Sequence, residues 1–169
     1  VKEGLEVLNS TTNIGINELI KISQIRDTFI DTYHIGYVLG PRINAAGRMG
    51  EPLDAVKLLC TKSPTNAEIL ASKLDSLNRS RQEITERLLK EADIQAKSQK
   101  SDKIIIIEGI DWEEGIIGLV AGKVTEEYER PCIVLSIRKG MVKGSSRSTS
   151  KLDITKTLSL FSKHLEKFG

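Results

Sequence analysis

Residues 40–50, with the sequence GPRINAAGRMG, combine side chains and backbone features that suit an anion-binding site. Arg42 and Arg48 carry guanidinium groups that can contact phosphate or carboxylate in a bidentate manner, and Asn44 adds an amide. The three glycines allow a tight turn, and Pro41 disfavours helical geometry at the residue before it. The stretch therefore predicts a turn that ends a preceding helix and holds an anion. The alternative is a structural turn whose arginines brace nearby carbonyl groups.

A second stretch places two cations and three hydroxyls within six residues: Lys143, Ser145, Ser146, Arg147 and Ser148. On a strand, side chains alternate between faces, so Ser145 and Arg147 share one face while Ser146 and Ser148 share the other. Cations supply attraction and hydroxyls supply positioning, as phosphate recognition requires. This pattern favours nucleic-acid contact over the alternative, a hydroxyl-rich edge strand.

Charge is unevenly distributed along the 169 residues, although the net charge is only +2. Residues 138–169 contain eight Lys and Arg against two Asp and Glu, whereas residues 101–137 contain three against eight. A basic terminal segment suits a polyanionic partner, or else forms a solvated lysine-rich surface. Aromatic residues make up only 4% of the chain, which argues against extensive base stacking.

Hydrophobic periodicity and turn residues predict a mixed α/β chain. Helices are expected over residues 3–9, 16–22, 33–39, 52–59, 65–98, 115–128 and 153–165, and strands over residues 104–107, 131–137 and 142–148. The isoleucines of residues 104–107 indicate a strand buried on both faces. The glycines at 115, 118 and 122 favour close helix packing over approach to a phosphate.

The helix over residues 65–98 is unusually long and contains no Gly or Pro. Its length suggests a rod that joins two bodies, and the alternative is two shorter helices broken near residues 78–81. Arg81 and Gln82 lie in a polar, cationic part of this helix, where they face either a nucleic-acid channel or water. Residues 98–102 are polar and form the expected domain boundary.

Cys60 and Cys132 lie in separate apolar contexts, which predicts buried thiols in a reducing cytoplasm rather than a disulfide. The sequence shows neither a signal-peptide pattern nor an apolar run of membrane-spanning length, so no membrane partner is expected. Because the chain begins at Val1 within a helical pattern, we expect it to be part of a longer protein.

The sequence resembles a known family at two places. GPRINAAGRMG closely resembles a segment of the RecJ family of single-strand-specific DNA exonucleases, within the DHH phosphoesterase superfamily. The glycines at 115, 118 and 122, followed by residues 130–131 and 143–148, resemble the DHHA1 domain that follows the catalytic domain. The resemblance implies the end of a DHH domain over residues 1–63, a connecting helix over 64–98, and a truncated DHHA1 domain over 99–169.

The resemblance also implies an activity. Members of this family hydrolyse single-stranded DNA from the 5′ end in DNA repair and recombination, using two Mn²⁺ or Mg²⁺ ions held by Asp and His residues of the DHH domain. Arg42, Asn44 and Arg48 would then lie near the active-site cleft. Ser145, Ser146 and Arg147 would hold the DNA backbone or its terminal phosphate from the other side, and the long helix would set the cleft width. Other DNA-repair proteins are a further expected class of partner.

The sequence departs from the family pattern in its metal ligands. It has no Asp-His-His string, and its two histidines, His34 and His164, cannot build a two-metal site alone. The Gly-Gly-His element expected after Phe168 is also cut at Gly169. We therefore expect no metal bound by this chain and no hydrolysis by it alone. Alternative functions are a DHH phosphodiesterase acting on short oligonucleotides or cyclic dinucleotides, and a non-catalytic nucleic-acid-binding module.

Overall fold

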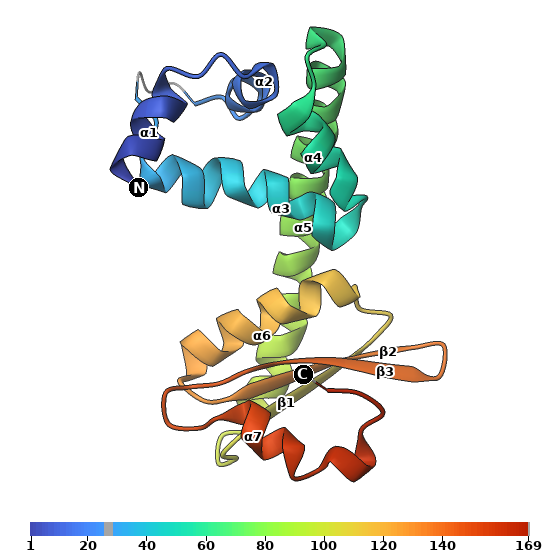
Figure 1. Cartoon of the computed structure of the whole chain (residues 1–169). Helices are drawn as coiled ribbons and strands as arrows, with labels where there is room; N and C mark the ends of the chain where they lie inside the picture. Colours follow the sequence, from blue (N-terminus) through green and yellow to red (C-terminus); the bar gives the residue numbers. More distant parts are fainter. Residues whose placement is uncertain (26–28, 169) are drawn as a thin grey trace. The chain divides into compact units, whose positions relative to one another are not determined.

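The computed structural model describes residues 1–25 and 29–168 and confirms an α/β chain that is mostly helical (Figure 1). Packing divides it into an N-terminal unit, residues 1–82, and a C-terminal unit, residues 83–169. The division falls within helix α5, Pro64–Ser98, which is continuous over 35 residues. The expected long helix is therefore confirmed, and the alternative with a break near residues 78–81 is wrong. The three-part domain division remains a prediction.

The N-terminal unit is built from helices alone among its described residues. They are α1 (Lys2–Asn9), α2 (Ile14–Ile22), η1 (His34–Leu39), α3 (Gly40–Met49), α4 (Pro52–Cys60) and the first part of α5. Its core contains Leu19, Leu58 and Leu74, which contribute from α2, α4 and α5. Asn13 caps α2 by accepting a hydrogen bond from the backbone N–H of Ile16.

The GPRINAAGRMG stretch is helical, so the predicted turn is wrong. Helical structure continues from residue 32 to residue 49, with η1 forming a wider π-helical section. The N–H of Gly40 bonds to the carbonyl of Ile35, five residues earlier, and a Cβ at Gly40 would approach that oxygen to 2.6 Å. The wider section lets Pro41 enter the helix, because the usual four-residue bonding is already interrupted.

The C-terminal unit contains a three-stranded sheet in the order β1-β2-β3. β1 (Ile105–Ile110) runs parallel to β2 (Cys132–Arg138), to which α6 (Glu114–Tyr128) connects it. β3 (Met141–Arg147) is antiparallel to β2 and follows a turn in which Lys139 and Gly140 have positive φ. Figure 1 shows α6 on one side of the sheet and α7 (Ile154–Ser159) on the other. The last predicted helix is shorter than expected, since α7 is followed by η2 (Ser162–His164).

β1 alternates between buried and exposed residues, so the prediction of burial on both faces is wrong. Ile105 and Ile107 are fully buried, whereas Ile106 is 51% exposed. One face of β1 packs into the core and the other faces solvent. β1 also lies at the edge of the sheet, where Gln95 of α5 and Gln99, which follows α5, bind its outer backbone groups. Gln99 pairs with Ile106 in both directions, at 2.7 and 2.9 Å, and Gln95 does the same with Glu108, at 2.8 and 3.0 Å.

Trp112, the single tryptophan of the sequence, packs directly on Gly109. A Cβ at Gly109 would overlap the indole ring. The indole N–H donates to Glu91 of α5 at 3.2 Å, and the Trp112 carbonyl accepts a 2.6 Å bond from Ser136 of β2. Trp112 therefore ties α5, β1 and β2 together in the C-terminal unit.

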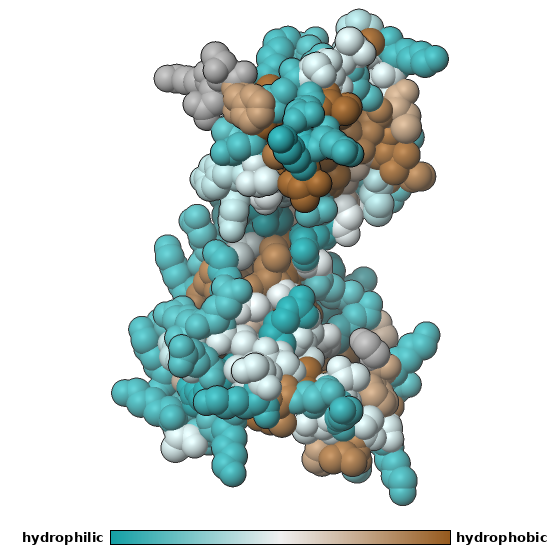
Figure 2. Space-filling view, turned by 60° about the vertical axis from the view of Figure 1, so that its left-hand side comes forward, coloured by the Kyte–Doolittle hydropathy of each residue, from teal (hydrophilic) through white to brown (hydrophobic). Residues whose placement is uncertain are grey.

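Figure 2 shows the hydropathy of one face of each unit. Hydrophilic residues dominate the face of the C-terminal unit in this view, and apolar residues gather on part of the N-terminal unit. In the part of the chain that the structure describes, no helix combines the length and hydrophobicity that crossing a bilayer requires.

The two cysteines have different environments. Cys132 of β2 is buried, as predicted, but Cys60 at the end of α4 is exposed, so that half of the prediction is wrong. Burial raises the pKa of the Cys132 thiol to about 12, because the thiolate is poorly solvated there. Both thiols are free.

A thiol-reactive chromogenic reagent should therefore distinguish Cys60 from Cys132. At mildly alkaline pH, well below about 12, Cys132 stays protonated and inaccessible, and only Cys60 should react in the folded protein. The second thiol should react after addition of denaturant, and Cys60→Ser should remove the fast reaction. Rapid reaction of both thiols in the folded chain would contradict this environment for Cys132.

Candidate nucleic-acid interface

Arg42 on α3 is engaged in contacts inside the N-terminal unit. Its side chain is only 16% exposed, and its Nε lies 2.8 Å from Oδ1 of Asp75 on α5. Its Nη1 also donates to the Val38 carbonyl at 2.8 Å. The other Asp75 oxygen, Oδ2, lies 2.9 Å from Nε of Arg79. This geometry favours the bracing interpretation for Arg42, because its guanidinium already binds a carboxylate and a carbonyl.

Arg48 and Arg81 form a pair of neighbouring cations, here called the arginine pair. Arg48 is exposed on α3, whereas Arg81 on α5 is half-buried and donates a 2.9 Å bond to Asn78. Burial, followed by the charge of Arg48, lowers the pKa of Arg81 below the ordinary arginine value. Two like charges held close together attract an anion, because an anion offsets their mutual repulsion.

Two further predicted residues, Asn44 and Gln82, are exposed and lie near the arginine pair in the sequence. Asn44 lies one helical turn before Arg48 on α3, and Gln82 directly follows Arg81 on α5. Both residues are exposed to solvent. The N-terminal unit thus presents two cations and two amides as a candidate phosphate-contacting set.

Lys143, Ser145 and Arg147 form a row along one face of β3, here called the β3 row, and this row faces α6. Lys143 Nζ lies 2.7 Å from Oε2 of Glu114 in the first turn of α6. A Cβ built on Gly118 would lie 3.1 Å from Ser145 Oγ and 3.7 Å from Nη2 of Arg147. The predicted alternation is therefore confirmed for Ser145 and Arg147.

The glycines of α6 differ in what they allow. A Cβ at Gly118 would press on Ser145, so glycine at this position lets α6 pack closely on β3. At Gly122 a Cβ would meet nothing within 4 Å, so close packing does not require glycine at that position. The close packing at Gly118 places α6 beside a hydroxyl and a guanidinium, two groups that bind phosphate oxygens.

Ser148 and Ser146 have local partners. Ser148 Oγ accepts a 2.9 Å hydrogen bond from the Ile154 N–H at the start of α7. Ser146 lies opposite Ile133 of β2, and its carbonyl accepts a 2.9 Å bond from Arg147 Nη1. Ser148 therefore has a structural role as a partner for α7, while Ser146 helps to orient the Arg147 guanidinium.

Two residues that shape the candidate surfaces were not predicted to contribute to a site. Asp75 binds Arg42 in the N-terminal unit, and Gly118 lies beside the β3 row in the C-terminal unit. The sequence signal for Asp75 was its i,i+4 spacing to Arg79, which indicates only a helical ion pair. Its partnership with Arg42 spans 33 residues and has no local sequence signal. Gly118 belonged to a recognised glycine series, and its contact with β3 depends on how helix and sheet pack.

Metal-binding side chains are not clustered in the described part of the chain, residues 1–25 and 29–168. No group of three or more His, Cys, Asp or Glu side chains is arranged there to hold a metal ion. His34 of η1 instead pairs with Asp31, whose Oδ1 lies 2.8 Å from His34 Nδ1. The residues that the structure describes do not fit a two-metal centre.

The helical unit exposes cationic and amide side chains, and the α/β unit carries a strand with cations and hydroxyls. Such surfaces are typical of nucleic-acid-binding proteins.

No protein-family model matches the sequence. The chain is 37% identical over 171 residues to the single-stranded-DNA-specific exonuclease RecJ of Bacillus subtilis, covering 98% of this chain and 22% of that protein. It is 32% identical over 165 residues to the RecJ protein of Salmonella typhimurium, covering 92% of this chain and 29% of the relative.

Solved structures show the same similarity. The RecJ–Mg²⁺ complex from Thermus thermophilus matches with a TM-score of 0.86 and 29% identity, over 100% of this chain and 26% of that one. The corresponding Mn²⁺ complex matches with a TM-score of 0.85 and 28% identity, over 99% of this chain and 24% of that one. The chain is a RecJ-like segment that spans between a fifth and three-tenths of the length of the curated relatives it matches.

Proposed function

We propose that this chain supplies DNA-binding surface to a single-stranded-DNA-specific exonuclease of the RecJ type, which cleaves from the 5′ end and acts in DNA repair and recombination. The support is of two kinds. The curated relatives are named as single-stranded-DNA-specific exonucleases, and the chain presents two sets of cationic and polar side chains, one on each unit.

The observation that carries the proposal is the β3 row beside Gly118. Ser145 and Arg147 both lie beside Gly118 of α6, and Arg147 is exposed, so a phosphate that approaches this face of β3 from solvent would meet a guanidinium and a hydroxyl together. Lys143, at the other end of the row, is paired with Glu114 but, unlike Arg42, has a largely exposed side chain, so it can exchange this carboxylate for a phosphate. Such contacts bind the DNA backbone without reading its sequence, as an exonuclease requires.

The arginine pair supplies the second proposed contact. Arg81 is half-buried and already bonded to Asn78, so its guanidinium is held in place before DNA binds. Arg48, more exposed, can adjust to the position of a phosphate. Asn44 and Gln82 would donate from their exposed amides, while Arg42 keeps α3 attached to α5 through Asp75.

The Mn²⁺ and Mg²⁺ complexes of Thermus RecJ suggest that the whole protein uses a divalent metal, and we include such a metal in the proposal. We assign no metal-dependent step to the residues described here, because they do not fit such a centre. We propose that the isolated chain binds single-stranded DNA without hydrolysing it. Turnover of a labelled single strand by the purified chain in the presence of Mn²⁺ would contradict that part.

Arg147→Ala should weaken binding of a single-stranded oligonucleotide about tenfold, because one charge-assisted phosphate contact is lost. The slope of log affinity against log salt concentration should decrease by about 1. Fluorescence anisotropy of a labelled oligonucleotide, repeated over a range of salt concentrations, measures both quantities.

Arg138→Ala is the matched control, because it removes the same charge from the end of the neighbouring strand β2. Arg138 is exposed, lies 3.7 Å from Asp111 and pairs with Met141, at the opposite end of the β2–β3 pair from Arg147, which pairs with Cys132. The proposal expects little change in affinity for this variant. Equal losses for Arg138→Ala and Arg147→Ala would show that binding reflects general positive charge, and would overturn the assignment of the β3 row.

A further inference from the structure

Two tyrosines stack on each other at the surface of the N-terminal unit. Tyr33 is 60% exposed and Tyr37 is 74% exposed. Their ring centroids lie 5.1 Å apart, with an angle of 27° between the ring planes. Aromatic rings are usually placed where they bury much of their area, so an exposed stacked pair is an uncommon feature. The pair therefore presents aromatic surface to solvent.

Helical spacing explains why these tyrosines meet. Tyr33 immediately precedes η1 and Tyr37 lies within it, four residues later, so the two side chains lie one above the other along the helix. The same helix then continues without interruption into α3. The tyrosine pair is thus fixed on the element that carries Asn44 and Arg48.

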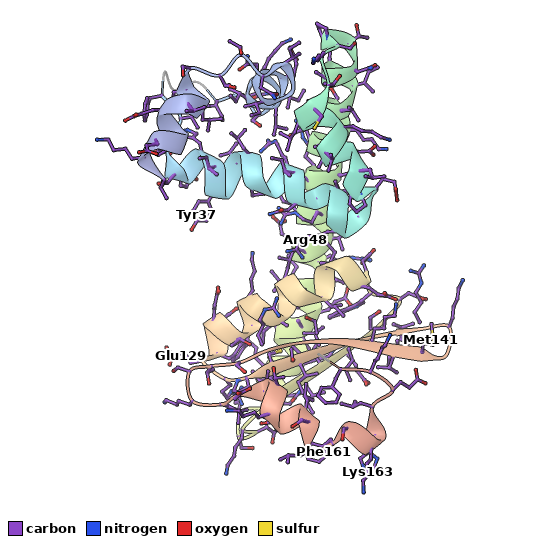
Figure 3. All side chains as sticks on the ribbon, in the orientation of Figure 1. Tyr37, Arg48, Glu129, Met141, Phe161 and Lys163 are labelled. Carbon is purple, nitrogen blue, oxygen red and sulfur yellow. The ribbon has the colours of Figure 1, made fainter. Side chains whose placement is uncertain are left out.

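The tyrosines and the arginine share one side of this helix. Tyr37, Asn44 and Arg48 follow each other at spacings of seven and four residues, which keeps them on one face of a helix. Figure 3 shows Tyr37 and Arg48 projecting from the same side of the ribbon. Aromatic surface at one end and cationic charge at the other therefore lie along a single exposed stripe.

We propose that Tyr33 and Tyr37 form a base-stacking subsite for single-stranded nucleic acid, which works together with the phosphate contacts of Arg48. This inference rests on the proposed function and adds to it a contact with the bases. Every base has a π face, so stacking of this kind tolerates any sequence. The low aromatic content allows one such platform, and two of the three tyrosines of the chain build it.

The neighbouring side chains favour a nucleic-acid strand over a protein surface as the occupant. A protein covering the tyrosine pair would also have to accommodate the amide of Asn44 and the charge of Arg48, which lie on the same stripe. A nucleic-acid strand matches both ends, since its bases stack on aromatic rings while its phosphates meet the cation.

The test compares two labelled oligomers of equal length, an oligothymidylate and an oligomer made only of abasic sites, which carries the same phosphates without bases. Tyr37→Leu should weaken oligothymidylate binding by the full chain about tenfold and leave abasic binding unchanged. Tyr37→Phe, which keeps the ring, should bind both oligomers as the unaltered chain does. Circular dichroism checks that each variant remains folded.

Each remaining outcome overturns the inference. Equal affinity of Tyr37→Leu and the unaltered chain for oligothymidylate would show that the tyrosines face another occupant, such as a protein surface. Equal losses on both oligomers would show an indirect effect on the phosphate contacts. If Arg48→Ala and Arg147→Ala weaken binding of both oligomers while Tyr37→Leu does not, the proposed function stands without the stacking subsite. If the unaltered chain binds neither oligomer, both proposals fail.

Discussion

Asp75→Ala is expected to destabilise the N-terminal unit by about 3 kcal/mol. The Asp75 carboxylate accepts from Arg42 at 2.8 Å and lies 2.9 Å from Arg79, and it is almost completely buried. Removing it leaves the Arg42 guanidinium poorly solvated and without its counter-charge, which costs more than the ion pair itself contributes. Urea unfolding followed by far-ultraviolet circular dichroism measures the change.

Arg79→Ala is the control for this prediction, because it removes the solvent-exposed partner of the same carboxylate. Arg79 is largely exposed, so its loss should cost less than about 1 kcal/mol. If the two variants have the same free energy of unfolding within experimental error, Asp75 does not hold α3 against α5. Arg42 would then be available to contact DNA, and its bracing interpretation would be wrong.

Gly109→Ala is expected to destabilise the C-terminal unit by at least about 2 kcal/mol, because the new methyl group overlaps the Trp112 indole. The indole is held by Glu91 and the Trp112 backbone by Ser136, so the ring cannot move without breaking contacts to α5 or β2. Trp112 is the single tryptophan, and its fluorescence therefore reports on this site directly. Its emission should shift to longer wavelength as the ring becomes more exposed.

Gly122→Ala provides a matched substitution in the same unit. A Cβ at Gly122 meets no atom within 4 Å, and alanine favours the helix by up to about 1 kcal/mol over glycine. This variant should be as stable as the unaltered chain or slightly more stable, with unchanged emission. Loss of stability in both glycine variants would contradict the packing described around Trp112.

Local sequence signals predicted the elements whose formation depends on periodicity. The long helix α5 follows from an apolar repeat without Gly or Pro, and the alternation along β3 follows from strand geometry. Residues 40–50 were wrongly predicted as a turn, because Gly and Pro usually interrupt helices. The π-helical section before Pro41 lets the helix continue through the proline. This section contains the hydrogen bond from the Gly40 N–H to the Ile35 carbonyl, which was not predicted from the sequence.

The candidate sites were predictable only where the contributing residues are close in sequence. Ser145 and Arg147 lie on one short strand, so their shared face could be predicted. The pairing of Arg42 with Asp75 and the proximity of Arg48 to Arg81 each depend on how α3 packs against α5. Tyr33 and Tyr37 are four residues apart within a predicted helix, which places them on one face, but their stacking and their exposure required the tertiary structure.

The glutamine contacts along β1 restrict how the sheet of the C-terminal unit can be extended. Four backbone hydrogen bonds that an incoming strand would need are already made by Gln95 and Gln99, which mimic a neighbouring strand with side-chain amides. Any strand added from a longer chain or a second molecule must therefore join beside β3. Such an addition would place new residues directly alongside Lys143 and Arg147, so enlargement of the sheet would directly change the surroundings of the β3 row.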